Sequence, residues 1–128
     1  MIFGIGTDIV QIARMQKNLD DHGERFAKRI LTDDEYSEYL GKPYQAHFLA
    51  KRFAAKEAAA KAMGTGFSQG LSLQHIGVTH NEMGKPLLTF SDIASQFMLD
   101  NKITEHHISL SDEKEYAVAF VTLVTNKL

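Results

Sequence analysis

Glu57 and Lys61, two side chains that could take part in catalysis or ligand binding, stand four residues apart in an alanine-rich stretch. On a helix this spacing places both side chains on one face, one turn apart. One interpretation is a surface ion pair, which stabilises a helix by roughly a few tenths of a kcal/mol. The other is a carboxylate that holds a cation beside a lysine that holds phosphate. The second gains weight because segment 42–61 contains five Lys or Arg residues and Glu57 as its single acid.

Asp8 is the second acid of interest. It follows an apolar, β-branched stretch that is interrupted by Gly4 and Gly6, where a strand allows close backbone approach. An aspartate in this position is typical of a helix N-cap. The alternative is an oxygen ligand for a divalent ion.

The histidines do not form an obvious metal site. His106 and His107 are adjacent in a predicted strand, so they point to opposite faces and do not easily share an ion. His107 shares a face with Ser109 and Ser111. Three such polar groups on an inner strand need partners, and a ligand could supply them.

Two glycine-containing segments have mainly structural interpretations. Gly64 begins the segment Gly64-Thr65-Gly66, which follows a predicted helix and therefore suits a helix C-cap better than a phosphate loop. Gly84-Lys85-Pro86 is typical of a hairpin turn in which the proline opens the next strand.

Composition limits the class of protein. The 128 residues carry a formal charge of −2, 44% of them are apolar and none is cysteine. We therefore expect a single domain over residues 1–128 with one core, no disulfides and a cytoplasmic location. A pI near 6.3 disfavours a general nucleic-acid-binding surface. No signal peptide or membrane span is expected, since no apolar run approaches the roughly 18 residues that a span needs.

Local patterns predict a mixture of helices and strands. Alanines at both flanks of the helix over 44–63 should let a neighbour pack close to its axis, with Arg52, Lys56, Glu57 and Lys61 on one stripe. The other predicted elements are a buried strand within 1–10 that ends at Asp8, two short helices within 11–30 that break at Gly23, a helix from the capping box Thr32–Glu35 to Gly41, hairpin strands 73–80 and 86–90, a helix over 92–99 capped by Ser91, and strands through 107–111 and 116–124.

Taken together, the motifs resemble the holo-acyl-carrier-protein synthase family, the short bacterial type of 4′-phosphopantetheinyl transferase. Asp112 stands where some members have histidine. The resemblance covers nearly the whole chain and rests on Gly4-Ile5-Gly6-Thr7-Asp8-Ile9, on Arg14, on Arg25-Phe26-Ala27-Lys28-Arg29-Ile30-Leu31-Thr32, on the helix from Arg52 to Gly66, on Gly84-Lys85-Pro86, and on the segment from His107 to Ala117.

This resemblance implies an α+β fold in which a small antiparallel sheet packs against the long alanine-rich helix and shorter helices. It implies transfer of 4′-phosphopantetheine from coenzyme A to a serine of apo-acyl carrier protein in fatty acid biosynthesis, with release of adenosine 3′,5′-bisphosphate. Such a transfer needs charge neutralisation by a divalent ion and lysine. Either a metal-bound water or a carboxylate relay would serve as the general base.

The resemblance also implies roles for particular residues. Asp8 and Glu57 would bind Mg²⁺ and, with Lys61, form the catalytic set. Coenzyme A would contact Arg52, Lys61, Gly64, Lys85, His107, Ser109 and Ser111, and the carrier protein would contact Arg14, Arg25, Phe26, Lys28 and Arg29. The family further implies a homotrimer with active sites between subunits.

Two other functions are compatible with the same residues. The chain could be a non-enzymatic adaptor that binds an acidic helical partner through Arg14, Arg25, Lys28 and Arg29. It could also be a metal-dependent nucleotide pyrophosphatase that uses the same carboxylates with water as the nucleophile.

Overall fold

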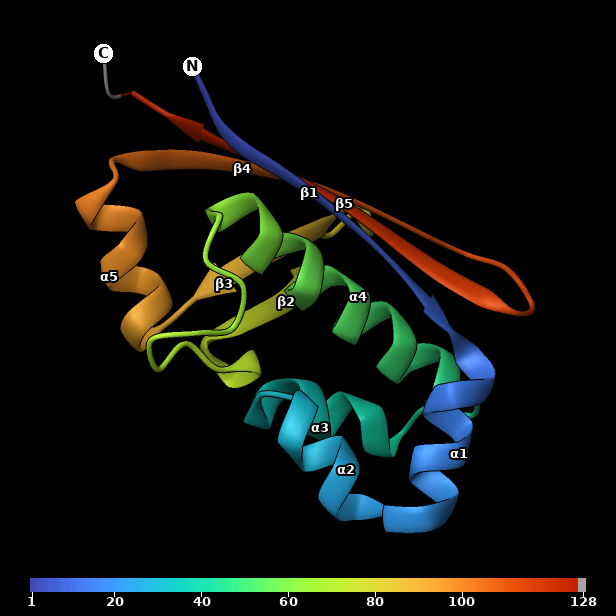
Figure 1. The fold of residues 1–128 in the computed structure, drawn as a ribbon. Helices are drawn as coiled ribbons and strands as arrows, with labels where there is room; N and C mark the ends of the chain where they lie inside the picture. The colour runs from blue at the N-terminus through green and yellow to red at the C-terminus, as the bar shows by residue number, and fades with distance from the viewer. Residues whose placement is uncertain (127–128) are drawn as a thin grey trace.

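The computed structural model describes residues 1–126 of the chain, and Figure 1 shows the path of the backbone. The element bounds are β1 Ile2–Gln11, α1 Ile12–His22, α2 Glu24–Ile30, α3 Asp33–Leu40, α4 Gln45–Met63, a 3₁₀ turn η1 Leu73–His75, β2 Ile76–His80, β3 Pro86–Phe90, α5 Asp92–Asp100, β4 Ile103–Asp112 and β5 Tyr116–Thr125.

The strands form two antiparallel sheets. A three-stranded sheet in the order β1, β5, β4 is called the main sheet here, and β2 with β3 forms a separate hairpin. The long helix α4 lies along one face of the main sheet, α1, α2 and α3 gather at one end, and α5 lies at the other end (Figure 1). This arrangement confirms the predicted α+β class. Within the described residues no helix is both long and apolar enough to cross a membrane.

The contact between α4 and β1 is unusually close. A β-carbon placed on Gly4 would lie 2.0 Å from the carbonyl oxygen of Ala62, and one on Gly6 would lie 2.0 Å from that of Ala58. Such distances are far below van der Waals contact, and a helical carbonyl cannot easily move away. The alanines of α4 and the two glycines of β1 therefore let the helix axis approach the sheet, as the alanine pattern predicted.

Several local predictions are confirmed. The Thr32 hydroxyl accepts a hydrogen bond from the Glu35 amide, while the Glu35 carboxylate accepts one from the Thr32 amide, which completes the capping box of α3. Helix α4 spans nearly the predicted range and ends at Gly64, whose φ of 83° is left-handed. The predicted strand over 73–80 begins instead with the 3₁₀ turn η1. Ser91 is the N-cap residue of α5, although its side chain makes no capping hydrogen bond.

The opening strand differs from the prediction in length and burial. Asp8 lies within β1 opposite Ala119 of β5, so the strand does not end there and Asp8 is not a helix N-cap. Gln11 is the N-cap residue of α1. Only one face of β1 is covered by α4, and Ile5 and Ile9 on the other face are 59% and 63% exposed.

That uncovered face of the main sheet, called the outer face here, carries three short rows of side chains. β1 and β5 contribute mostly apolar groups to it, and β4 contributes a polar column. These polar groups are exposed to solvent because none of the described residues covers this face, and β4 is an edge strand and not the inner strand that was expected. The rows, read from β1 through β5 to β4, are Ile5–Thr122–His107, Thr7–Phe120–Ser109 and Ile9–Val118–Ser111.

Candidate functional site

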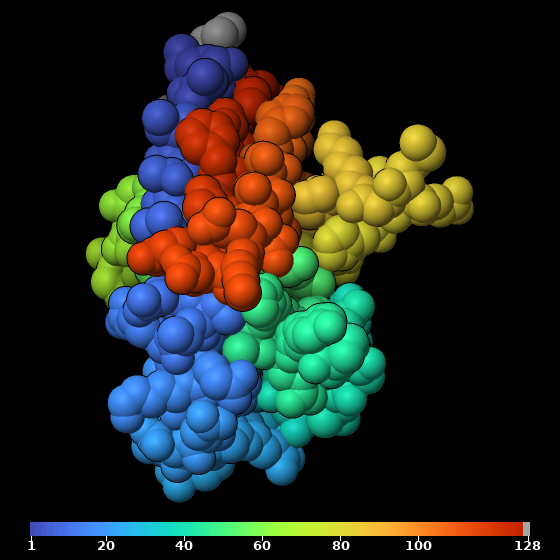
Figure 2. Space-filling model, turned by 90° about the vertical axis from the view of Figure 1, so that its right-hand side faces the viewer, coloured from blue at the N-terminus to red at the C-terminus, as the bar shows by residue number. Residues whose placement is uncertain are grey.

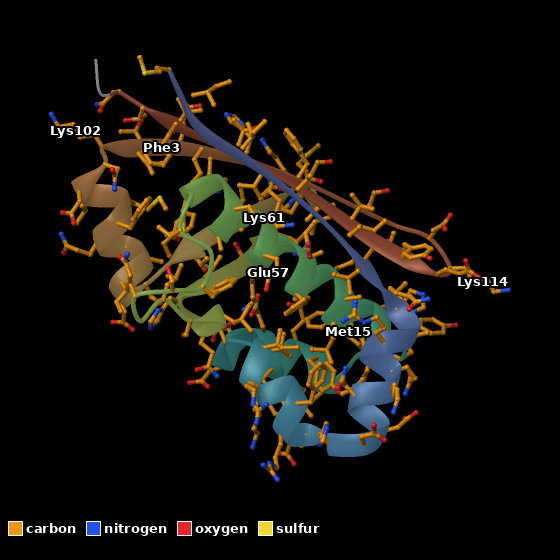
Figure 3. The ribbon with its side chains drawn as sticks, viewed as in Figure 1. Phe3, Met15, Glu57, Lys61, Lys102 and Lys114 are labelled. Carbon is orange, nitrogen blue, oxygen red and sulfur yellow. The ribbon has the colours of Figure 1, made fainter. Side chains whose placement is uncertain are left out.

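Asp8 and Lys61 come together where β1 crosses α4. The Lys61 Nζ donates to Asp8 Oδ1 at 3.1 Å and to the carbonyl oxygen of Thr7 at 2.9 Å. The close helix–strand contact makes this possible, because Gly6 also lies against the Cβ of Lys61. Figure 3 labels Lys61 and Glu57 on the length of α4 that lies beside β1.

Glu57 faces the same region but has no direct partner. Among the described residues its carboxylate forms no hydrogen bond and no ion pair, so the surface ion pair with Lys61, one of the two interpretations of this spacing, does not form. Burial and the negative charge of Asp8 raise the pKa of Glu57, while the Lys61 ammonium opposes that rise. An acid without a partner next to a second acid is an arrangement that a bound cation would stabilise.

The residues present fit a hard divalent ion of the Mg²⁺ type. Asp8 and Glu57 offer carboxylate oxygens, the ligand type that this ion prefers. Within residues 1–126 no group of three or more His, Asp or Glu side chains is placed to hold a metal by itself. Two protein carboxylates with the other positions left to water and phosphate are typical of Mg²⁺ sites in phosphoryl-transfer proteins.

The charged residues of α4 do not share one stripe, which corrects the prediction. Arg52 and Lys56 lie on a different flank from Glu57 and Lys61, and they are 3% and 0% exposed. Lys56 therefore does not reach solvent or a phosphate. Its Nζ donates to Glu35 Oε1 at 2.6 Å and to the carbonyl oxygen of Leu73 at 3.0 Å.

Glu35 is the acid that compensates this buried flank. Besides Lys56 and the capping contact with Thr32, its Oε2 accepts a hydrogen bond from the Val78 amide of β2 at 2.9 Å. Arg52 lies within 3.9 Å of the same carboxylate and packs over the Phe48 ring at 4.3 Å. Burial lowers the pKa of Lys56, and the Glu35 carboxylate opposes this shift by favouring the ammonium form.

A pocket of approximately 870 Å³ lies on the other side of α4. It opens between the hairpin, the start of α4 and β4, and Figure 2 shows the hairpin standing out from the body beside these segments. We call it the large pocket. Its lining is Glu38, Lys42, Pro43, Tyr44, His47, Phe48, Lys51, Arg52, His80, Gly84, Pro86, Ile108, Ser109, Leu110 and Asp112.

The residues expected to contact coenzyme A are distributed over three places. Arg52 lines the large pocket, and Lys85 lies in the turn between the lining residues Gly84 and Pro86. Ser109 also borders this pocket, although it belongs to the outer-face column of β4. His107 and Ser111 lie on the outer face, where the His107 Nε2 is 3.0 Å from Glu105 Oε2. Lys61 and Gly64 lie near the C-terminal end of α4, outside the pocket lining.

Sequence reasoning missed most of the pocket lining. Lys42, Tyr44, His47 and Lys51 come from the start of α4 and the turn before it, and Asp112 joins them from β4, 3.9 Å from Lys51. The positive charge of segment 42–61 was a signal for this pocket. The sequence alone does not show that these cations lie on a different flank of α4 from Glu57.

The residues expected to bind a carrier protein lie on α1 and α2. Arg14, Arg25 and Arg29 are exposed and have no side-chain partner among the described residues, whereas Phe26 is half-buried. Lys28 differs from them, because its Nζ pairs with Glu24 at 2.6 Å and lies over the Tyr36 ring.

Known proteins resemble the chain closely. Residues 4–121 match the family described as the 4′-phosphopantetheinyl transferase superfamily. A holo-[acyl-carrier-protein] synthase of Nitrosococcus oceani is 54% identical over 99% of this chain and 82% of its own length. The crystal structure of the synthase of Neisseria meningitidis has a TM-score of 0.93 at 41% identity, covering 98% of this chain and 100% of that one. The synthase of Bacillus anthracis, solved in complex with CoA (3′,5′-ADP), has a TM-score of 0.82 at 39% identity, covering 98% and 99% of the two chains.

The fold and the matched residues define a 4′-phosphopantetheinyl transferase superfamily protein. Within it, the chain belongs to the holo-[acyl-carrier-protein] synthase family. The adaptor and pyrophosphatase alternatives find no support among these relatives.

The buried flank of α4 makes a testable prediction about stability. Lys56→Met should lower the free energy of unfolding by about 3 kcal/mol or more, because the buried Glu35 carboxylate loses its compensating charge. The double variant Lys56→Met with Glu35→Gln should be less destabilised than the sum of the two single variants, since a neutral amide is cheaper to bury. Urea denaturation measures both effects.

Lys17→Met is the matched control, because Lys17 forms an exposed ion pair with Asp21 on α1. Its unfolding midpoint should not change measurably. Equal effects of Lys17→Met and Lys56→Met would contradict the structural role assigned to Lys56.

Proposed function

We propose that this chain transfers 4′-phosphopantetheine from coenzyme A to a serine of apo-acyl carrier protein. The observation that carries this proposal is the convergence of Asp8, Glu57 and Lys61 at one point of a chain that belongs to the synthase family. The acceptor is the carrier protein of fatty acid biosynthesis, and the reaction takes place in the cytoplasm.

The reaction is a phosphoryl transfer. The serine hydroxyl oxygen forms a bond to the phosphorus that carries pantetheine, the bond from that phosphorus to the bridging oxygen breaks, and the hydroxyl proton is released. The products are the phosphopantetheinyl serine and adenosine 3′,5′-bisphosphate. Positioning and charge neutralisation supply most of the catalysis of such a reaction.

Asp8 and Glu57 are the residues that would hold Mg²⁺. When bound, the ion neutralises charge on the pyrophosphate oxygens and on the leaving group. Lys61 has to release Asp8 to contact the pyrophosphate, since its ammonium occupies that carboxylate in the free protein. Its exposed side chain has the freedom to make this movement.

The large pocket is the proposed site of the nucleotide part of coenzyme A. Its volume suits a ligand of that size. Lys42, Lys51 and Arg52 supply positive charge for phosphates, and the rings of Tyr44 and His47 supply surfaces for adenine. The solved Bacillus anthracis relative, which contains CoA (3′,5′-ADP), supports a nucleotide site in this fold.

The active site is proposed to lie between subunits of a homotrimer. Asp8 is on β1 and Ser109 is on β4, and these strands are the two opposite edges of the main sheet. The outer face between them exposes Ile5, Ile9 and Phe120 next to the polar column of β4. An apolar strip of this kind is typical of a subunit interface. Packing copies there would allow residues of one copy to complete the site of its neighbour.

The carrier protein is proposed to bind α1 and α2. Carrier proteins of this reaction are acidic, and Arg14, Arg25 and Arg29 present free guanidinium groups on one end of the molecule. Lys28 lies at the same place, paired with Glu24, and Phe26 adds a partly exposed ring.

The mass of purified apo-acyl carrier protein tests the function directly. Incubation with coenzyme A, Mg²⁺ and this protein should add one phosphopantetheine group to the carrier. Release of nucleotide without a change in carrier mass would indicate a pyrophosphatase, and no change in either molecule would indicate a binding protein.

The acids make the sharpest catalytic prediction. Asp8→Asn and Glu57→Gln should each lower kcat/KM on the order of a hundredfold or more, because each removes a ligand of an ion that stabilises the transition state by several kcal/mol. The double variant should be far from additive, since both residues serve one ion. Lys61→Ala should also impair transfer, with less effect on Mg²⁺ affinity. Magnesium titration of steady-state transfer measures all four variants, and wild-type rate and magnesium dependence in Glu57→Gln would defeat this mechanism.

Charge reversal should separate carrier binding from coenzyme A binding. Arg25→Glu combined with Arg29→Glu should raise the KM for the carrier by roughly tenfold at low salt, and added salt should reduce the difference. Coenzyme A affinity should stay unchanged. Lys102→Glu, at the far end of the molecule in Figure 3, is the control and should leave the carrier KM unaltered. An unchanged KM in the Arg25 and Arg29 variant would refute this docking surface.

Light scattering tests the assembly. The wild type should have three times the mass of the 14.3 kDa chain, and Phe120→Glu on the outer face should dissociate it and abolish transfer. Leu40→Glu is a matched control, since Leu40 is 61% exposed on α3 and lies outside that face. A wild-type monomer with full activity at micromolar concentration would rule out the shared site.

A further inference from the structure

The hairpin of β2 and β3 has two free edges. It does not join the hydrogen-bond ladder of the main sheet, although β3 runs beside β4. An isolated two-stranded hairpin is marginally stable in water. Contacts at its edges therefore decide how firmly it is held.

Side chains from neighbouring elements accept hydrogen bonds from both edges of the hairpin, at one pair of facing residues. Val78 and Leu88 are Cα partners across the hairpin. On one edge the Val78 amide donates to Glu35 Oε2 at 2.9 Å. On the other edge the Leu88 amide donates to the Nε2 of His106 on β4 at 3.0 Å. Among the described residues this is the one hydrogen bond that joins β3 to β4.

The contact with His106 lies next to the wall of the large pocket. Pro86, two residues before Leu88, and Ile108, two residues after His106, both line that pocket. The turn residue Gly84 lines it as well. The separation of β3 and β4 at His106 therefore sets the separation of the two sides of the pocket wall.

We infer that His106 is a positioning residue that fastens the hairpin to β4 and so fixes the wall of the coenzyme A pocket. The inference rests on the proposed function in one respect, namely that coenzyme A occupies the large pocket. The sequence predicts only that His106 and His107 point to opposite faces, and the structure assigns His106 this specific acceptor role.

Acceptance by Nε2 requires a neutral imidazole with its proton on Nδ1. A protonated ring would turn a second N–H toward the Leu88 amide, and the contact would be lost. The charged and titratable groups around the ring are His107 and Glu105 on β4 and Lys85 in the hairpin turn. Phe90 of β3 packs edge-on against the ring at 5.9 Å. On the side of α5 the neighbours are Ser95, Met98 and Leu99, none of which titrates.

The pH dependence has a definite sign. Burial, followed by the charges of His107 and Lys85, lowers the pKa of His106 below its ordinary value of 6.5. The neutral ring is thus present at pH 7, and the fastening is lost as the pH falls through this lowered pKa. Acid should loosen the hairpin in the wild type.

Three variants test the inference. His106→Leu removes the acceptor, and His106→Gln keeps an acceptor that does not titrate. His22→Leu is the matched control, because His22 is exposed at the end of α1 and has no partner among the described residues. The measurements are hydrogen exchange at the Leu88 amide, followed as the pH is lowered stepwise from 7.5, and the Kd for coenzyme A by calorimetry at pH 7.5.

At pH 7.5, His106→Leu should speed Leu88 exchange and weaken coenzyme A binding by about two- to tenfold, the usual worth of one hydrogen bond. His106→Gln should restore much of both, and His22→Leu should match the wild type. After correction for intrinsic exchange, the wild type should lose protection as the pH is lowered through the depressed pKa of His106, and His106→Gln should keep it. This comparison remains informative even if His106→Leu fails to fold.

Each contrary result has a distinct meaning. Unchanged Leu88 protection in His106→Leu, or equal acid sensitivity in the wild type and His106→Gln, overturns the fastening role. Faster exchange without weaker coenzyme A binding overturns the link to the pocket. If the wild type binds coenzyme A with the expected dependence on His106 but never modifies a carrier protein, the positioning role is supported and the proposed transfer fails.

Discussion

The distance between α4 and β1 is the constraint on which the rest of the structure depends. Gly4 and Gly6 have no room for a β-carbon, because each would place it 2.0 Å from a carbonyl oxygen of α4. Any larger residue would push the helix away from the strand. At the observed distance the Lys61 ammonium reaches both the Thr7 carbonyl and the Asp8 carboxylate. Gly4 and Gly6 have no reactive side chains, but they allow the close approach that brings Asp8, Glu57 and Lys61 together.

The same helix has to serve two environments. Successive residues of an α-helix point roughly 100° apart, so Lys56 and Glu57 face different neighbours although they are adjacent in the chain. Lys56 is fully buried and is compensated by Glu35, while Glu57 faces Asp8 without a direct partner. Cations on the buried flank are satisfied inside the protein, and this leaves the acids on the other flank available for a cation from solution.

Local patterns carried much of the prediction from sequence. The capping box at Thr32, the alanine helix and its glycine end depend on residues within a few positions of one another, and all are present. The errors concern contacts between distant segments. Lys56 pairs with an acid 21 residues away in the sequence. β5 lies between β1 and β4 in the main sheet, and this pairing of distant segments leaves β4 at the edge. The sequence does not predict the large pocket for the same reason, since its lining comes from three distant segments, namely the start of α4, the hairpin and β4.

Glu35 connects the two halves of the proposed site. One oxygen of its carboxylate accepts a hydrogen bond from the Lys56 ammonium, and the other accepts one from the Val78 amide of the hairpin. The hairpin that walls the large pocket is therefore anchored to α4 on its β2 edge, and through His106 to the main sheet on its β3 edge. α4 is in turn seated on the main sheet by its contact with β1. A change in the distance between α4 and β1 would thus move both the acids and one anchor of the pocket wall. The geometry of nucleotide binding and the geometry of the cation site therefore both depend on this one distance.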